Sequence, residues 1–414
     1  MVLAALGVNL LIGSLYAWSV MGKALVGQWH WTKTQAMLPF AISTASFAVT
    51  MIFAGRWQDK IGPRYVAMLG GIIFGLGMVL SSFVRDPLAM VLTFGVVGGI
   101  GIGLGYSATT PPSIKWFPPA RKGLITGIVV SGVGLAAVYM SPLTNYLLKV
   151  ATISQTFLIL GIGTIVAVAL LAQLLTNPPA GYVPAAPAPT TAAKAKPAAA
   201  PRRDLDWHEM LGTGQFYQLW LMFILSASAG LLIIGNITLI AADQVPQWNN
   251  AFLLVMVVAI FNTCGRFLSG YVSDRIGRTN TMVLAFVLQA VNMFMFVQYR
   301  TPGMLLFGSA FTGLCYGTIF TLFPAATADF YGVRNLGVNY GTVFTAFGVA
   351  GVTGSVLGGR VRDLFGSYTY AFIVCGIMLL VGAALAFLLR APKIEPAPAA
   401  AASAAPKPDT ACRS

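Results

Sequence analysis

The chain has 414 residues, of which 57% are hydrophobic and only 9% are charged. A soluble domain has about 25% charged residues, so this composition excludes a soluble globular protein and indicates a protein that crosses a membrane several times. The net charge of +14 does not indicate a nucleic-acid partner, because the basic residues lie in short loops between apolar runs, where they determine topology.

Apolar segments near the roughly 20 residues that a spanning helix needs alternate with short loops along the whole chain. Glycine-rich stretches inside them, such as residues 95–105, predict close helix contacts in lipid, because lipid-exposed backbone must satisfy its own hydrogen bonds. The twelve predicted segments are residues 1–22, 34–55, 65–84, 88–110, 123–147, 155–175, 217–241, 250–270, 281–298, 303–325, 337–358 and 369–390.

The N-terminus is apolar from the first residue and has no basic region, so no cleaved signal peptide is expected. The first helix should begin almost at residue 1, which leaves open a longer natural N-terminus. The four cysteines and two histidines form no cluster and no CxxC pair. Neither a disulfide, nor a metal site, nor a cofactor is predicted.

A stretch rich in alanine and proline, residues 177–201, predicts a flexible linker between the sixth and seventh segments. Residues 202–211 predict a short amphipathic helix with Trp207 at the membrane surface. The tail repeats the Ala/Pro composition and is predicted to be disordered. The predicted parts are an N-terminal six-helix half (1–176), a cytoplasmic linker (177–204), a C-terminal six-helix half with its lead-in helix (205–391) and a cytoplasmic tail (392–414).

Lysine and arginine are distributed unequally between the two sides of the predicted membrane. The loops after even-numbered segments, the linker and the tail together contain 17 of them, and the opposite side contains 7. By the positive-inside rule, both termini and the linker should lie in the cytoplasm of a multi-pass protein of the inner cell membrane.

Two loops of the chain repeat one pattern. Residues 55–64 (Gly-Arg-Trp-Gln-Asp-Lys-Ile-Gly-Pro-Arg) are echoed by residues 270–278 (Gly-Tyr-Val-Ser-Asp-Arg-Ile-Gly-Arg), at an offset of 215. A second echo, Gly123-x-x-x-Gly127 with Gly337-x-x-x-Gly341, has an offset of 214. Two echoes at nearly one offset predict two homologous halves.

The paired loops, the twelve segments and the central linker resemble the major facilitator superfamily over essentially the whole chain. The resemblance implies an all-α membrane fold, with twelve transmembrane helices in two pseudo-symmetric halves that work by alternating access. In that family the loop motif fastens neighbouring helix ends and opens during transport. A structural and gating role is therefore implied for Asp59, Lys60, Arg64, Asp274, Arg275 and Arg278.

Several local patterns resemble the animal monocarboxylate transporters and their bacterial relatives, including lactate transporters and the oxalate:formate antiporters. They occur in order and in the expected segments. The patterns are Gly13-Ser-Leu-Tyr-Ala-Trp18, Gly105-Tyr106, Lys115-Trp-Phe-Pro118, Arg121-Lys-Gly123, Phe261-Asn262-x-x-x-Arg266, Tyr316-Gly-Thr-Ile-Phe320-Thr-Leu-Phe323-Pro324, Arg334-Asn335 and Asn339-Tyr340-Gly341.

Arg266 lies inside the eighth apolar run, and no aspartate or glutamate lies inside any of the runs. An arginine at the bilayer centre costs about 2.5–3.5 kcal/mol on insertion scales, so it usually faces the protein interior and has a partner. We expect that partner to be the carboxylate of a transported solute, which a guanidinium binds through both oxygens. Backbone carbonyls at a helix end are the structural alternative.

Two departures from the oxalate antiporters favour a smaller charge on the substrate. By the resemblance, Phe347 replaces a lysine and Leu15 replaces a glutamine. One cation with apolar neighbours suits a C2–C4 monocarboxylate, similar to lactate or pyruvate, because a second carboxylate would remain uncompensated.

Two further departures concern the proton. The animal transporters have an aspartate at the position of Asn262 and a lysine at that of Val20, so the usual proton carriers are both missing. Asn262 lies one turn from Arg266 and would orient the guanidinium or bind a substrate hydroxyl.

Other pocket residues follow mainly from the resemblance. The Tyr106 and Tyr316 hydroxyls lie in apolar runs and need partners, which a substrate or a neighbouring helix would supply. Phe320, Phe344 and Phe347 would line the pocket or simply pack. The remaining pocket residues implied by the resemblance are Leu15, Tyr16 and Val133. The loop or cap residues expected near segment ends are Asp243 and Asp329.

The sequence therefore predicts a secondary transporter of small monocarboxylates, and the resemblance implies that it works by proton symport. The partners expected are a carboxylate, protons and the lipid bilayer, without nucleic acid or an obligate protein partner. An enzyme is not indicated, because no nucleophile–base pair, metal set or phosphate loop is present. The alternatives are carboxylate exchange, as in the oxalate:formate antiporters, and a non-transporting carboxylate sensor, which would need a folded effector domain.

Overall fold

Helices account for all the regular secondary structure in the part of the chain that the structure describes. This computed structural model describes residues 1–118, 122–179, 182, 204–332 and 335–392. Within these residues, 12 helical spans are long and apolar enough to cross a membrane, which confirms the predicted number. Most run a few residues beyond the predicted segments.

The N-terminal half contains six of these spans, and two of them are not continuous α-helices. The first is interrupted by a short 3₁₀ segment, and the fourth contains a π-helical stretch. The elements are α1 (Val2–Ile12), η1 (Gly13–Ala17), α2 (Trp18–Trp29), α3 (Lys33–Ile61), α4 (Pro63–Ser81), α5 (Pro87–Met90), η2 (Val91–Gly98), α6 (Gly99–Ser107), α7 (Thr110–Lys115), α8 (Lys122–Val150) and α9 (Ile153–Ala172).

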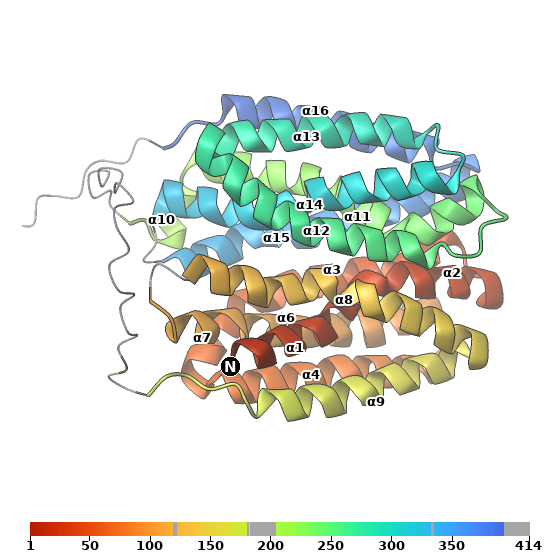
Figure 1. Ribbon diagram of the computed structural model, residues 1–414, viewed down its shortest axis with the longest axis horizontal. Helices are drawn as coiled ribbons and strands as arrows, with labels where there is room; N and C mark the ends of the chain where they lie inside the picture. The colour runs from red at the N-terminus through yellow and green to blue at the C-terminus, as the bar shows by residue number, and fades with distance from the viewer. Residues whose placement is uncertain (119–121, 180–181, 183–203, 333–334, 393–414) are drawn as a thin grey trace, which may run out of the picture.

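The C-terminal half repeats the arrangement after a short lead-in helix. Figure 1 shows the two halves as separate bundles lying side by side, with α10 at the end where the linker leaves α9. The elements are α10 (Trp207–Leu211), α11 (Gly214–Gln244), α12 (Phe252–Ile276), α13 (Arg278–Phe296), α14 (Pro302–Tyr331), α15 (Leu336–Phe365) and α16 (Thr369–Leu388). We call the end of the molecule at which α10 lies the linker end, and the opposite end the far end.

The repeated loops have the same backbone geometry, which supports two halves of common design. Gly62 ends α3 with φ 94° and ψ 157°, and Gly277 ends α12 with φ 89° and ψ 160°. This region is essentially restricted to glycine, because a Cβ atom would clash with the backbone. The glycine of each motif therefore allows a helix to turn directly into the next one.

Helices within the N-terminal half approach backbone to backbone at glycines. A Cβ atom at Gly101 on α6 would lie 2.3 Å from the Phe74 nitrogen and 2.7 Å from the Gly70 oxygen, both on α4. A Cβ atom at Gly70 would lie 2.4 Å from the Gly105 nitrogen. These contacts confirm that the glycine-rich run of the fourth segment serves close helix packing.

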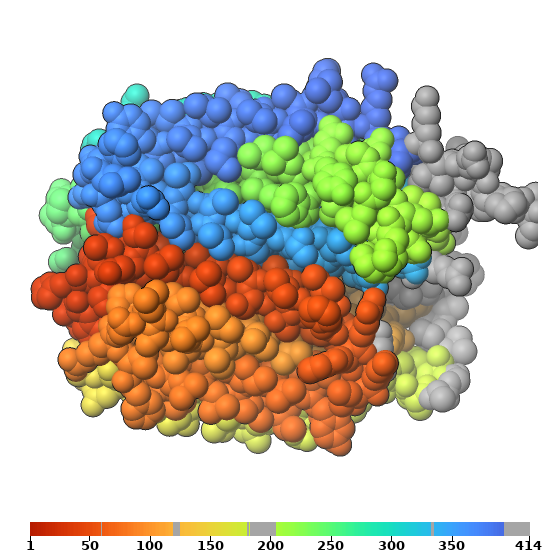
Figure 2. Space-filling view, turned by 180° about the vertical axis from the view of Figure 1, so that it is seen from behind, coloured from red at the N-terminus to blue at the C-terminus, as the bar shows by residue number. Residues whose placement is uncertain are grey.

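The two halves meet mainly where α3 faces α15 and where α8 faces α12. On α15, a Cβ atom at Gly351 would overlap the Thr44 hydroxyl of α3, and one at Gly359 would lie 2.8 Å from the Lys33 oxygen. Figure 2 shows the halves closely apposed along this seam on the face that it presents. At the linker end of α15, by contrast, Gly341 has nothing within 4 Å of a built Cβ atom.

The lead-in segment is bound to the linker end of the C-terminal half. The Leu205 nitrogen donates to the Tyr331 oxygen at 3.0 Å, and its oxygen accepts from the Asn339 amide, also at 3.0 Å. Asp206 and Glu209 form a capping box that starts α10. A helix is therefore present where the amphipathic pattern predicts one, although it begins only at Trp207.

The close approach of α4 and α6 yields a test of the packing. Gly101→Ala should lower the melting temperature of the purified protein by several degrees, because overpacking a tight contact costs about 1–3 kcal/mol. Gly163→Ala on α9 is the matched control, since a Cβ atom there has nothing within 4 Å. Equal melting temperatures for the two variants would contradict the described packing.

Candidate functional site

The Arg266 side chain lies between the two halves and is held there by uncharged groups. The residue is 9% exposed. Its Nε donates to Asn262 Oδ1 at 3.3 Å, and one terminal nitrogen donates to the Val130 carbonyl of α8 at 3.3 Å. The guanidinium carbon lies 4.4 Å from the centre of the Phe320 ring. Among the described residues, no carboxylate forms an ion pair with Arg266.

Both halves bring tyrosine hydroxyls into the electrostatic field of Arg266. Its charge acts on Tyr16 of η1, Tyr106 of α6, Tyr316 of α14 and Tyr340 of α15. The rings of Tyr16 and Tyr316 meet edge to face, with their centres 6.5 Å apart. The Tyr316 hydroxyl is buried near Tyr16 but makes no hydrogen bond of standard geometry to a described residue. The Tyr16 hydroxyl lies close enough to be its partner.

An aromatic cluster continues from Phe320 to the N-terminal half. The ring centres of Phe320 and Phe347 are 5.8 Å apart, and Phe347 stacks on Phe344 at 5.0 Å. Phe47 of α3 contacts Phe344 at 5.5 Å and also Tyr106 at 5.5 Å. The structure thus brings the predicted aromatic residues together. It adds Phe47, which sequence reasoning missed, and Tyr340, which was noted only as part of a motif.

The three residues assigned only by resemblance lie at the contact between η1 and α8 or close to it. A Cβ atom at Gly13 would lie 2.7 Å from the Val133 oxygen, so η1 packs directly on α8. Leu15 and Val133 are both buried in this packing. The 3₁₀ segment interrupts the first span at this point, which was not predicted, and it carries Tyr16 toward the C-terminal half.

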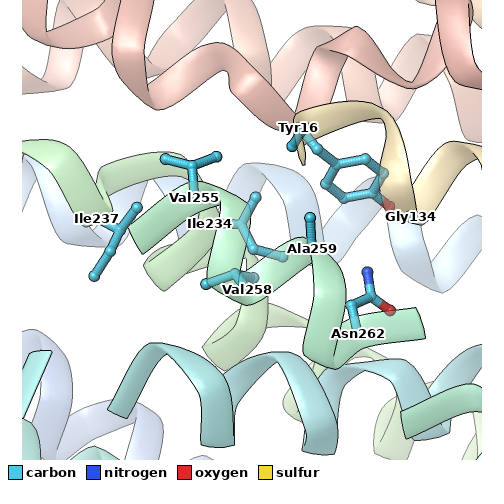
Figure 3. Close-up of a pocket in the computed structure, with 9 residues that line it drawn as sticks. Tyr16, Gly134, Ile234, Ile237, Val255, Val258, Ala259 and Asn262 are labelled. Carbon is cyan, nitrogen blue, oxygen red and sulfur yellow. The ribbon is translucent and has the colours of Figure 1, made fainter. Parts of the chain in front are cut away.

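A narrow cavity lies beside Asn262, on the far-end side of Arg266. It contains about 260 Å³ of space not filled by atoms, with free room for about one water molecule. Figure 3 shows aliphatic side chains from two helices of the C-terminal half along it, with Tyr16 and Asn262 at one end. The lining residues are Tyr16, Gly134, Ala137, Ile234, Ile237, Val255, Val258, Ala259 and Asn262.

Charged residues connect the two halves at the far end. Lys33 of α3 forms an ion pair with Asp243 of α11 at 2.7 Å, and Arg362 of α15 contacts the same carboxylate. Asp363 accepts hydrogen bonds from the Lys33 nitrogen at 3.1 Å and the Thr34 nitrogen at 2.8 Å. The expectation that Asp243 is a loop or cap residue was wrong, because it lies within α11 and bridges the halves.

At the linker end, the described contacts of the motif residues stay within one half. Arg278 Nη1 lies 3.0 Å from Asp274 Oδ1, and Arg278 Nε lies 3.4 Å from Asp329 Oδ2. Arg278 therefore joins α12, α13 and α14. Arg275 lies over the Tyr271 ring instead, at 4.3 Å. Arg64 donates to the Gln173 oxygen at 2.5 Å and joins α4 to the end of α9. Lys60 is exposed, and the side chain of Asp59 is outside the described residues.

Comparisons with known proteins agree with this architecture. The oxalate:formate antiporter of Oxalobacter formigenes is 27% identical over 395 residues, which cover 93% of this chain and 90% of that protein. Monocarboxylate transporter 14 of Mus musculus is 24% identical over an alignment of 467 positions, gaps included, which covers 95% of this chain and 90% of that protein.

Solved structures and a family model identify the fold and the family. The structure of the D-xylose-proton symporter superposes with a TM-score of 0.68 at 15% identity, covering 94% of this chain and 97% of that one. At this identity the likeness shows the fold alone. The family model described as Major Facilitator Superfamily matches residues 2–297 and 247–412. With its 12 spans in two bundles, the chain belongs to the Major Facilitator Superfamily, whose members are membrane transporters and not enzymes.

Proposed function

We propose that this protein transports small monocarboxylates, with Arg266 binding the substrate carboxylate. The observation that carries the proposal is a buried guanidinium that has no carboxylate partner in the described part of the chain. A buried charge is costly unless it is paired. Asn262, Val130 and Phe320 hold the guanidinium in place but do not neutralise it, and a carboxylate from solution would.

The surrounding groups suit a carboxylate better than another anion-binding chemistry. A guanidinium binds both carboxylate oxygens in one plane, and tyrosine hydroxyls donate further hydrogen bonds. Tyr316 comes from the same half as Arg266, and Tyr106 comes from the other half. Substrate would thus bind between the halves near the membrane midplane, where alternating-access carriers hold their cargo.

The number of charges favours a monocarboxylate. Arg266 is the only lysine or arginine that is less than a tenth exposed among the described residues. Two relatives carry the names of an oxalate:formate antiporter and a monocarboxylate transporter, which supports a small carboxylate as cargo. The aromatic cluster at Phe347 offers no second cation, so a dicarboxylate would bring one unpaired charge into the protein.

We further propose that a proton moves with the substrate. Asn262 cannot carry a proton, and no carboxylate contacts Arg266 among the described residues, so the proton would enter with the acid or through water beside the guanidinium. Exchange of carboxylates, as the name of the Oxalobacter formigenes relative describes, is the second candidate.

Removing the guanidinium tests the central assignment. Arg266→Ala should reduce lactate uptake into proteoliposomes by about 30-fold or more, because truncating one partner of a buried charge pair costs about 2–5 kcal/mol. Arg266→Lys should restore only part of it, since an ammonium group does not bind both oxygens. Arg360→Ala, at an exposed position of α15, is the control. Near-normal uptake by a well-folded Arg266→Ala variant would refute the assignment.

The coupling mode can be measured with two substrates. Labelled lactate should accumulate in proteoliposomes when the external pH is lower than the internal pH, and should not accumulate when the gradient is dissipated. Labelled oxalate should not be taken up at a comparable rate, because its second charge would remain unpaired. Oxalate uptake that requires internal formate and no proton gradient would favour the exchanger instead.

The far-end ion network should keep that end closed. Asp243→Asn removes the carboxylate shared by Lys33 and Arg362, and a loss of about 1–2 kcal/mol would raise the open population about 5- to 30-fold. The readout is an Ile237→Cys variant in which the native cysteines are replaced. A membrane-impermeant maleimide added at the far side should react with this cysteine faster when Asp243→Asn is also present, by the same factor as the open population rises.

Asp86→Asn is the control for this measurement. It removes one negative charge from the same end but retains the cap of α5, and it does not bridge the halves. Equal labelling rates for the Asp243 and Asp86 variants would show that the network does not hold the far end closed.

A further inference from the structure

We propose that the aliphatic end of the transported acid occupies the cavity beside Asn262, and that Val258 and Ala137 set the chain length that is accepted. This inference rests on the proposed function, because it places the tail of a substrate whose carboxylate binds Arg266. It assigns selectivity to residues other than Phe347 and Leu15, which the sequence pattern singled out.

The cavity lies close to the guanidinium, although Arg266 itself does not line it. Gly134 and Asn262 both line it. A Cβ atom at Gly134 would lie 3.8 Å from Arg266 Nη2 and 3.8 Å from Asn262 Nδ2. No side chain at Gly134 separates the cavity from the charge. A carboxylate on Arg266 would therefore have its carbon chain within reach of this space.

The cavity is polar at one end and apolar along the rest of its length. The Tyr16 hydroxyl and the Asn262 amide provide its polar side chains, and both lie at the Arg266 end. The remaining side chains are aliphatic, from α8, α11 and α12. Burial of a methylene group in such surroundings is favourable, whereas burial of a second carboxylate or an ammonium group is costly. The polarity therefore matches a monocarboxylate with a short, uncharged tail.

The aromatic cluster around Phe347 is closely packed and lies outside the cavity. Phe347 is 1% exposed and stacks on Phe344, and its edge contacts reach Phe47 and Phe320. Phe347 does not line the cavity. Substitution there would first disturb the packing between the halves. The cavity also has room for about one water molecule, so binding must widen it, which favours short chains.

The position of the polar groups also specifies the head of the substrate. A hydroxyl or keto oxygen at the second carbon would lie next to the carboxylate, at the end of the cavity where Tyr16 and Asn262 can hydrogen-bond to it. The chemical class is therefore a 2-hydroxy or 2-keto acid with a straight tail of one to three carbons.

The test is a chain-length series on the purified full-length protein. Acetate, propionate, butyrate and valerate would compete with labelled lactate uptake in proteoliposomes, and the same acids would be titrated in a thermal-melting assay that requires binding alone. Val258→Ala should strengthen the binding of valerate relative to propionate about fourfold for each additional methylene group that the cavity accommodates. Ala137→Val should shift the binding preference toward shorter acids. Ile260→Ala, on the same helix but 41% exposed, should leave the order unchanged.

The outcomes separate this inference from the proposed function. If the unmodified protein binds and transports acids but Val258→Ala leaves the chain-length order unchanged, the cavity assignment is wrong and carboxylate transport stands. If Phe347→Cys changes the chain-length order and Val258→Ala does not, selectivity belongs to the aromatic cluster and the cavity assignment is wrong. If no acid is transported and none raises the melting temperature, both the proposed function and this inference fail.

Discussion

The rest of the site depends on one constraint, a buried guanidinium for which the described residues supply no carboxylate. Arg266 is held by the Asn262 side chain, the Val130 carbonyl and the face of Phe320, all of them uncharged. These contacts fix the orientation of the charge and leave its compensation to a mobile anion. An aspartate in place of Asn262 would compete with that anion at every step.

The packing determines which of these contacts move together. A Cβ atom at Gly317 of α14 would lie 2.1 Å from the Asn262 oxygen, so α12 and α14 are in backbone contact beside the site. Arg266, Asn262, Phe320 and Tyr316 therefore lie on two closely packed helices of one half. Val130 belongs to the other half, so a rocking motion of the halves would change the contact from Arg266 to Val130 and preserve the others. The charge would keep its orientation while its exposure changes.

The twelve spans could be predicted because long charge-poor runs are rare outside membranes, and the burial of Arg266 could be predicted because the residue interrupts one of them. The buried position of Phe47 could not be predicted, because hydropathy does not distinguish it from Phe53 on the same helix. In the structure Phe47 is 5% exposed and Phe53 is 57% exposed. Asp243 was misread for a related reason: its partner Lys33 is 210 residues away, so no local pattern indicates the pair. The aliphatic cavity likewise consists of ordinary Val, Ile and Ala residues that become a site only through their shared position.

The uncharged contacts of Arg266 also bear on how the empty carrier would return. A loaded carrier contains one guanidinium and one carboxylate, which together are neutral and can cross the low-dielectric interior between the halves. An empty carrier must move the bare cation, and with no other support it would have to return with a second anion, as an exchanger does. Asn262, Val130 and the Phe320 ring supply part of the missing stabilisation, since carbonyl oxygens and an aromatic face each attract a cation. Those three contacts would therefore favour a carrier that can return empty, and with it net uptake over obligatory exchange.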